Sequence, residues 1–330
     1  MDNRNRFRVR ATREITLAAA CAVTASLFQA FSPYYLTLSN VATVFRNSIE
    51  LWLVSLGMTF VLATAGVDVA VGGILGICAI LAGWGVQGNW PAAFIFLIGP
   101  MAGATLGLVA GALVVLGKVP PIVATLGLFG IYRSAMFLFL GGNWISGLPE
   151  FTGGVLSRTI GPFPVSLGCV AVAYLSAALI LHWTPLGVAV LATGGNERAA
   201  RLAGVGIGRT KIFVYGFTGL LAGVAAVLYV ARYRNVETST GGLVALDAIV
   251  AAVLGGSTVL GGKANLLGTF LGVLLVRLLQ NGFVLIGVPS LWEQVITGVL
   301  LVFVLAADAV AARSSGFGAS RVIGQGRAIP

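Results

Sequence analysis

The sequence predicts an all-α, polytopic membrane protein of about ten transmembrane helices, some of them interrupted or re-entrant. Hydrophobic residues make up 58% of the 330 and charged residues only 9%, whereas a soluble domain carries about 25% charge. The apolar runs are long and continuous, without the alternation of a strand. Since lipid cannot hydrogen-bond the backbone, only helices and closed barrels cross it, and the continuous runs favour helices.

Apolar runs of the length that crosses a bilayer, roughly 17–25 residues, recur about ten times along the chain. The predicted spans are Ile15–Phe31, Ile49–Ala65, Val69–Val86, Ala92–Leu116, Ile122–Leu140, Phe163–Trp183, Ile212–Val230, Leu243–Leu260, Leu266–Ile286 and Trp292–Ala311. The third and the eighth are rich in glycine, so each is expected to be broken or to cross only part of the membrane.

Basic residues support this topology and orient it. With a cytoplasmic N-terminus, fourteen of the 20 Lys and Arg residues fall in cytoplasmic segments, four fall outside and two fall within spans. The four outside are Arg46, Arg158, Arg232 and Arg234, and the two within spans are Arg133 and Arg277. Cytoplasmic loops of membrane proteins carry an excess of Lys and Arg. The net charge of +10 therefore reflects orientation and predicts no nucleic-acid partner.

No polar segment is long enough to form a soluble domain, so residues 1–330 are expected to form one transmembrane domain. Its cytoplasmic parts are the N-terminal tail 1–14, the loop 184–211 and the C-terminal tail 312–330. The longest outer segment is the loop Gly141–Gly161.

Two short stretches of the chain resemble each other, because Asp68 is followed by VAVGG and Asp247 by AIVAAVLGG. Inverted repeats with interrupted helices are common in transporters, but chance similarity in a chain rich in Gly and Val explains the match equally well. Asp68 either lines a cavity at an interrupted helix or caps the next helix at the membrane interface.

Glycines and charges near the other spans have structural interpretations. The glycines at 255, 256, 261 and 262 permit a re-entrant turn or close helix packing, and packing is the favoured interpretation. Glu50 and Arg46 form an i,i+4 pair at an outer helix end, and Arg277 is expected to pair with Glu293.

The segment Thr193–Val205 predicts a short helix at the cytoplasmic surface. Asn196 is a good N-cap, Glu197 and Arg201 are an i,i+4 pair, and Gly204 suits the left-handed position that ends a helix. An ordinary basic loop is the alternative, but a self-capped helix with small apolar contacts is better explained as an element that docks into a partner.

The polar segment GGNERAARLAGV, Gly194–Val205, resembles the cytoplasmic coupling segment of permease subunits in the ribose-type, carbohydrate-uptake ABC importers. AGVDVAVG, from Ala65 to Gly72, resembles that family's TGGIDLSVG, with Ala65 and Ala70 departing from its usual glycine and serine. KVPPIVATLG from Lys118, the LDAI and LGGST stretches from Leu246 and Leu254, and the GVP of Gly287 follow in the family's order.

The resemblance implies a type II ABC importer-like permease of a bacterial inner membrane, with both termini cytoplasmic. It implies coupling to an ATPase subunit through Gly195, Asn196, Glu197, Arg198, Ala199, Ala200, Arg201, Leu202 and Gly204. The pathway candidates are Gly66, Asp68, Gly72, Asp247, Gly255 and Gly256. It also implies a second permease copy or a homologous permease, and a periplasmic binding protein that delivers a sugar which the sequence does not identify. The candidate contacts for that protein are Glu150, Arg158, Arg232, Arg234 and Glu237.

The chain lacks the motifs of catalysis and of ATP binding. Its two Gly-Lys pairs, at Lys118 and Lys263, are followed by Val119 and Ala264, so neither belongs to a phosphate-binding loop. ATP and Mg²⁺ are therefore expected on the partner ATPase, and this chain is expected to bind no cofactor or metal and to have no catalytic residue. The alternatives are an ion-coupled secondary transporter that acts alone and a membrane scaffold that transports nothing.

Overall fold

The computed structural model of the chain describes residues 3–289 except Ser157, together with residues 292, 295, 297–299, 302, 303 and 306, with side chains from Arg13 onward. The predicted span Trp292–Ala311 therefore lies largely outside the described residues, as do Glu293 and the tail 312–330.

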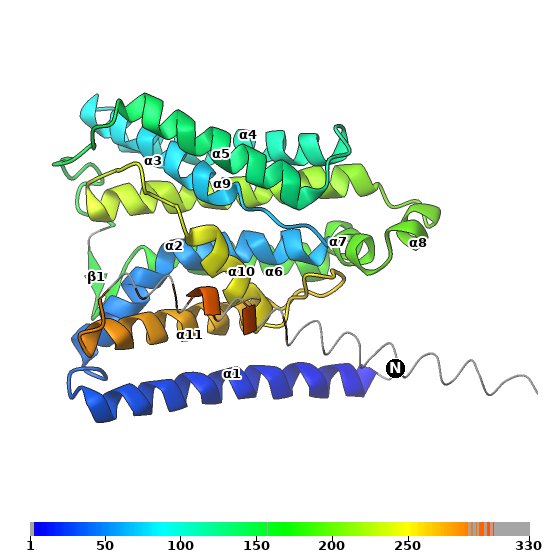
Figure 1. Cartoon of the computed structure of the whole chain (residues 1–330), viewed down its shortest axis with the longest axis horizontal. Helices are drawn as coiled ribbons and strands as arrows, with labels where there is room; N and C mark the ends of the chain where they lie inside the picture. Colours follow the sequence, from blue (N-terminus) through cyan, green and yellow to red (C-terminus); the bar gives the residue numbers. More distant parts are fainter. Residues whose placement is uncertain are drawn as a thin grey trace, which may run out of the picture.

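The described chain is almost entirely helical, as predicted. Its helices are α1 (Asn3–Phe31), α2 (Leu38–Ala63), α3 (Val71–Gln87), α4 (Ala92–Val115), α5 (Pro121–Leu140), α6 (Leu167–Trp183), α7 (Pro185–Gly195), α8 (Glu197–Leu202), α9 (Ile207–Tyr233), α10 (Val244–Leu254) and α11 (Leu266–Leu285). In Figure 1 the long helices lie side by side, α8 lies beyond one end of the bundle, and the short strand β1 (Thr159–Ile160) lies at the other end.

Among the described residues, five helices are long and apolar enough to cross a membrane: α1 from Arg13, α4, α5, α9 and α11. The consecutive helices α6 and α7, bent by 75°, give a sixth candidate if they count as one span. The helices in the two glycine-rich predicted spans are shorter, since α3 has 17 residues and α10 has 11. The structure thus confirms a multi-pass helical protein, whereas helix length and composition alone do not confirm a count of about ten spans.

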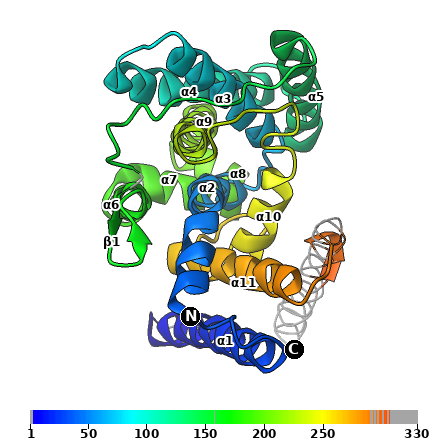
Figure 2. The same ribbon diagram turned by 90° about the vertical axis from the view of Figure 1, so that its left-hand side faces the viewer.

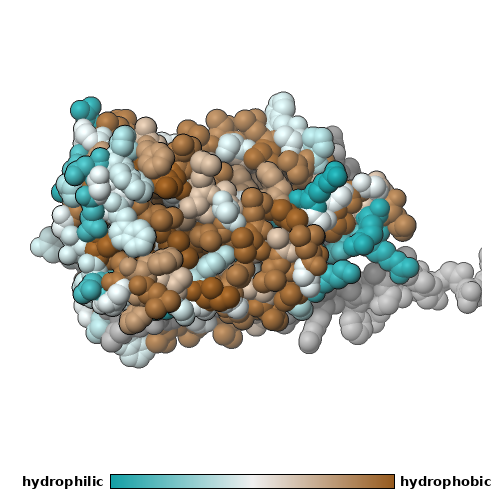
Figure 3. All heavy atoms as spheres, turned by 90° about the horizontal axis from the view of Figure 1, so that it is seen from above, coloured by the Kyte–Doolittle hydropathy of each residue, from teal (hydrophilic) through white to brown (hydrophobic). Residues whose placement is uncertain are grey.

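The surface of the bundle matches a membrane environment. Large apolar side chains such as Val23 of α1, Met101 of α4 and Leu138 of α5 are well exposed. Figure 3 shows that apolar residues form a broad band between two polar ends on the face in view. This is the pattern expected of a surface that faces lipid between two aqueous phases.

Helix α2 forms the core and lies at the centre of the bundle in Figure 2, surrounded by α6, α9, α10 and α11. Every residue from Ser48 to Ala63 is buried, and Trp52 stacks on Phe270 of α11 with ring centroids 4.6 Å apart. Burial on all sides is typical of a helix enclosed by protein. Polar residues such as Glu50 are therefore sheltered from lipid in this helix.

Helices α4 and α9 pack with their backbones in contact along a line of glycines. A β-carbon added at Gly103 of α4 would lie 2.2 Å from the carbonyl oxygen of Gly219 of α9. At Gly99 the nearest atom would be a Val227 methyl carbon at 2.4 Å. Small residues let membrane helices approach this closely, which increases van der Waals contact where no hydrophobic effect drives association.

One predicted helical start is wrong. Phe163–Pro164 forms strand β2, which pairs antiparallel with β1, and α6 begins only at Leu167. The reason is local: Gly161 has φ +62°, which suits a tight turn, and Pro164 has no amide hydrogen to donate. The loop between α5 and α6 therefore carries a small hairpin.

Candidate functional site

The predicted cytoplasmic helix is confirmed as a structural element. The Asn196 side-chain oxygen accepts a hydrogen bond from the Ala199 amide at 2.9 Å, Glu197 pairs with Arg201 at 3.0 Å, and Gly204 has φ +84°. These interactions form α8 over six residues, Glu197–Leu202, somewhat shorter than the segment predicted.

A second cation, which the sequence did not reveal, joins α8 to α9. The Lys211 ammonium lies 2.7 Å from the other oxygen of Glu197. This hydrogen bond, followed by the charges of Lys211 and Arg201, lowers the pKa of Glu197. Glu197 is therefore ionised at neutral pH and fixes the orientation of α8 against the start of α9.

The outward side of α8 is open to solvent. Arg198, Ala199 and Arg201 are exposed, and Leu202 is 84% exposed. Only Ala200 of this helix is buried. A leucine this exposed beside two arginines, beyond the end of the bundle, suits contact with another protein.

Backbone contacts connect this end of the bundle to its core. The Gly262 amide donates to the Ala63 carbonyl, at the end of α2, at 2.9 Å. A β-carbon on Gly194, near the end of α7, would lie 1.9 Å from that carbonyl oxygen and 2.6 Å from the Gly262 nitrogen. The segment that leads into α8 thus touches both α2 and the loop between α10 and α11.

The linker between α2 and α3 carries Asp68, which is fully buried. Its carboxylate faces the amides of Ala70 and Val71, at the start of α3, without full hydrogen-bond geometry. Both interpretations of Asp68, as a residue that lines a cavity and as a cap of the next helix, therefore stay predictions. The preceding carbonyl, of Val67, accepts from Thr125 of α5 at 3.2 Å and from Tyr215 of α9 at 3.4 Å, which holds the linker in place.

The two glycine-rich segments that were expected to be interrupted touch each other. A β-carbon on Gly72, at the start of α3, would lie 2.4 Å from the carbonyl oxygen of Gly241, in the linker before α10. A β-carbon on Gly241 would lie 2.3 Å from the Gly72 oxygen. The two stretches that resemble each other in sequence therefore belong to segments that are in contact, and the contact is made by glycine backbone.

A cavity of about 910 Å³ borders both linkers, reaching Val69 before α3 and Ser239–Leu243 before α10. Its charged lining residues come from α2, α5, the linker before α10, α10 itself and α11: Glu50, Arg133, Glu237, Asp247 and Arg277. Of the six pathway candidates, Asp247 is the one that lines this cavity. Its carboxylate lies 4.0 Å from the Arg277 guanidinium.

Other pathway candidates have packing or turn roles. Gly255 packs on Gly268 of α11, where a β-carbon would lie 2.4 Å from the Gly268 carbonyl carbon. Gly256 has φ +105° at the following turn, and a β-carbon on Gly66 would lie 2.9 Å from the Tyr215 hydroxyl. In the loop after α10, Gly255 thus provides close packing and Gly256 provides a turn.

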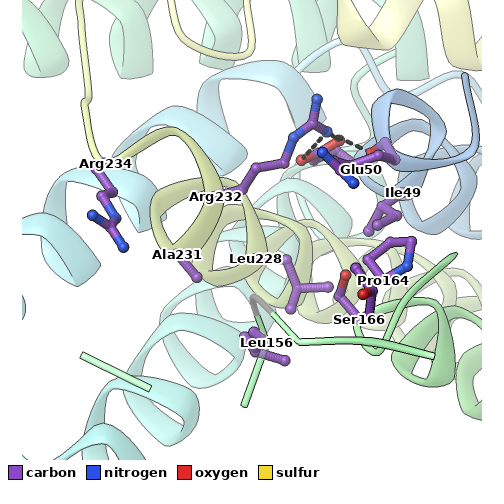
Figure 4. Close-up of a pocket in the computed structure, with 11 residues that line it drawn as sticks. Ile49, Glu50, Leu156, Pro164, Ser166, Leu228, Ala231, Arg232 and Arg234 are labelled. Carbon is purple, nitrogen blue, oxygen red and sulfur yellow. Dashed lines mark hydrogen bonds and ion pairs between the residues drawn. The ribbon is translucent and has the colours of Figure 1, made fainter. Parts of the chain in front are cut away.

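A smaller pocket of about 420 Å³ lies at the hairpin end of the bundle (Figure 4). There Arg232 of α9 reaches across to Glu50 of α2 at 3.4 Å and also donates to Asn47 and to the Arg46 carbonyl. The predicted pairing of Glu50 with Arg46 is therefore wrong. Glu50 is buried and Arg46 is exposed, so the cation that reaches Glu50 comes from a neighbouring helix.

The five candidate contacts for a binding protein differ in accessibility. Arg158 and Arg234 are exposed, whereas Glu150 and Glu237 are half-buried. Glu150 accepts hydrogen bonds from the Thr152 and Gly154 amides and from the Thr152 hydroxyl, and the Thr152 side chain is the main cause of its lowered pKa. Arg232 is engaged with Glu50, as described above.

A family model described as "Branched-chain amino acid transport system / permease component" matches residues 40–305. The chain belongs to this permease family.

Relatives of the permease align along nearly its whole length. The Autoinducer 2 import system permease protein of Enterobacter sp. (strain 638) is 35% identical over 300 residues, which are 90% of this chain and 86% of the relative. The Ribose import permease protein of Escherichia coli (strain K12) is 32% identical, covering 88% of this chain and 91% of the relative. That of Bacillus subtilis (strain 168) is 35% identical, covering 84% and 87%. No solved structure matches the chain.

Sequence reasoning missed Arg133 and Arg277 of the permease as site residues. Both lie within predicted spans, and an ionisable residue inside a membrane segment is by default a candidate for function. That signal was present in the sequence, but their convergence on one cavity depends on the fold. Among the described residues, no group of three His, Cys, Asp or Glu side chains is placed to hold a metal.

Replacing Gly194 with alanine is expected to separate the end of α7 from α2, because the new β-carbon would collide with the Ala63 carbonyl. The matched control is Gly195→Ala, whose β-carbon would have its nearest neighbour, the Gly262 α-carbon, at 3.9 Å. Hydrogen exchange of the Gly262 amide should accelerate in Gly194→Ala and stay unchanged in Gly195→Ala. Equal protection in both variants would refute the contact.

Proposed function

We propose that this permease is the membrane-spanning subunit of an ATP-driven importer for a small sugar in a bacterial inner membrane. The observation that carries the proposal is the alignment, over 84–90% of the chain, with permeases whose names specify import of ribose and of autoinducer 2. The family description names branched-chain amino acids, but the relatives that align along the whole chain favour a sugar or a related small molecule.

The coupling element in this proposal is α8 with its flanking residues, Gly195–Gly204. Its exposed Leu202 and its arginines are the surface that a cytoplasmic ATPase subunit grips. ATP and Mg²⁺ bind to that subunit, so this chain needs neither a catalytic residue nor a cofactor. Movement of α8 passes through Gly194 to the Ala63–Gly262 contact, and from there to the linker that carries Asp68.

The proposed topology has ten crossings in one transmembrane domain, with both termini cytoplasmic. Helices α1–α6 and α9–α11 form nine of them, and the predicted span Trp292–Ala311 forms the tenth. The order of helices along the bundle in Figure 1 supports this topology, with α8 beyond one end and the hairpin at the other. The excess of Lys and Arg in the segments on the α8 side agrees with the positive-inside rule.

On the outer side, a periplasmic binding protein delivers the solute. Arg158 and Arg234 are the exposed candidates for its docking surface, with Glu150 and Glu237 beside them. Arg232 contributes indirectly, because its side chain is held by Glu50. A second permease, identical or homologous, completes the pathway.

Reconstitution separates this function from the alternatives. In proteoliposomes that contain the permease, its ATPase subunit and its binding protein, uptake of a panel of sugars that includes D-ribose should require ATP and all three components. Uptake driven by an ion gradient without the ATPase would show a secondary transporter instead. Absence of uptake under either condition would favour a scaffold.

Replacing Gly204 with alanine is expected to abolish ATP-driven uptake while leaving insertion in the membrane intact. Gly204 ends α8 with φ +84°, a conformation that costs a residue with a β-carbon about 1 kcal/mol or more, so the substitution should reorient the helix. Gly206→Ala is the control, since Gly206 has φ −75° and a β-carbon there meets only the Arg209 side chain. Full uptake by the Gly204→Ala importer would exclude a docking role for α8.

A further inference from the structure

Arg133 has an unusual position in the membrane domain. It lies within α5, one of the five helices able to span a membrane, and its side chain is exposed. No described residue forms an ion pair with its guanidinium, which lies 6.0 Å from the centre of the Phe129 ring. Because a charge facing the bilayer interior is very costly, this side chain must face water or protein.

The structure places Arg133 at the 910 Å³ cavity, which also receives Asp247 of α10 and Arg277 of α11. Its guanidinium occupies space that a side chain at position 242 would otherwise fill, since a β-carbon on Gly242 would lie 2.9 Å from the Arg133 Nη1. The linker before α10 is therefore shaped around this arginine. Three helices, α5, α10 and α11, thus bring two hydrogen-bond donors and one acceptor to one space.

The charges of this cavity balance. Its lining contains three carboxylates and two arginines, and Arg232 neutralises Glu50 from the adjacent pocket. The lining residues are Glu50, Glu237, Asp247, Arg133 and Arg277. A site without net charge favours a neutral solute over an anion or a cation. Guanidinium groups donate hydrogen bonds and a carboxylate accepts them, so together they match hydroxyl groups, which do both.

Aromatic rings complete the lining. Phe129 of α5 and Tyr229 and Tyr233 of α9 border the same space. The ring faces offer apolar contact to the C–H groups that a sugar exposes between its hydroxyls. Charged hydrogen-bonding groups beside aromatic rings are suited to bind a small polyhydroxylated molecule.

We propose that Arg133, Asp247 and Arg277 form a binding site for the hydroxyl groups of a neutral polyhydroxylated solute as it crosses the membrane. The proposal rests on the proposed import function and adds the residues that bind the solute. Arg133 contacts the solute, and Asp247 and Arg277 hold each other in position while they share its hydroxyls.

Cysteine accessibility tests the placement of Arg133 independently of any transported molecule. In a variant whose three native cysteines, Cys21, Cys78 and Cys169, are replaced by alanine, Arg133→Cys in the assembled importer should react rapidly with the water-soluble thiol reagent MTSET. Val23→Cys is the control, because Val23 of α1 is 67% exposed and is not among the residues that line the cavity. Equally slow reaction of both variants would show that Arg133 faces lipid or a protein interface, and would overturn the proposal.

Uptake tests the ligand class in the same reconstituted importer. D-ribose, D-xylose and myo-inositol serve as neutral probes and L-leucine as a zwitterionic probe. At least one neutral probe should be imported, and Arg133→Ala should lower its maximal rate by about tenfold or more, the effect of losing one charge-assisted hydrogen bond. Arg133→Lys should retain part of the rate, and Met101→Ala, an exposed position on α4, should retain all of it.

The outcomes separate this proposal from the import function on which it rests. Import of L-leucine alone, or an uptake rate that is unchanged in Arg133→Ala, would overturn the proposed binding site without contradicting ATP-driven transport. If no probe is imported under ATP, the sugar assignment itself fails, whereas rapid MTSET reaction at Arg133→Cys would still establish a water-filled cavity.

Discussion

The architecture depends on covering backbone where helices are interrupted inside a membrane. Lipid offers no hydrogen bonds to free amides and carbonyls, so the linkers before α3 and before α10 must be enclosed by protein. Glycine makes this possible, because Gly72 and Gly241 bring the two linkers into direct backbone contact. Tyr215 and Thr125 bind the Val67 carbonyl within the first linker. The cavity borders both linkers, and the neighbouring helices α2, α5, α9 and α11 supply the rest of its lining.

The same kind of contact links α8 to the core. Gly194 touches Ala63 and Gly262 through backbone atoms alone, so a shift of α8 has no flexible side chain in between to absorb it. Ala63 ends α2, and the linker that carries Asp68 follows directly. Close-packed backbones transmit small displacements because packed interiors have low compressibility. A displacement of α8 is therefore expected to move the walls of the cavity.

The sequence predicted those features that depend on neighbouring residues. Asn196, Glu197 and Gly204 define α8 through local capping and an i,i+4 pair, and the glycine-rich spans were expected to be interrupted. Contacts between distant segments were not predictable in this way. Glu50 binds Arg232, 182 residues away, in preference to Arg46 one turn away, because the fold buries Glu50 beside α9. The convergence of Arg133, Asp247 and Arg277 likewise depends on how three helices pack, and the hairpin at Phe163–Pro164 interrupts an apolar run that looked helical.

The central claim is that α8 controls the walls of the cavity through the Gly194 contact. Ser239, exposed in the linker before α10 and lining the cavity, reports on those walls. The decisive measurement is the rate at which MTSET modifies Ser239→Cys in the assembled importer, with and without trapped ATP. The account predicts that the rate changes with nucleotide state, and that Gly194→Ala removes the change while Gly195→Ala keeps it. A rate independent of nucleotide, or a change that persists in Gly194→Ala, would contradict it.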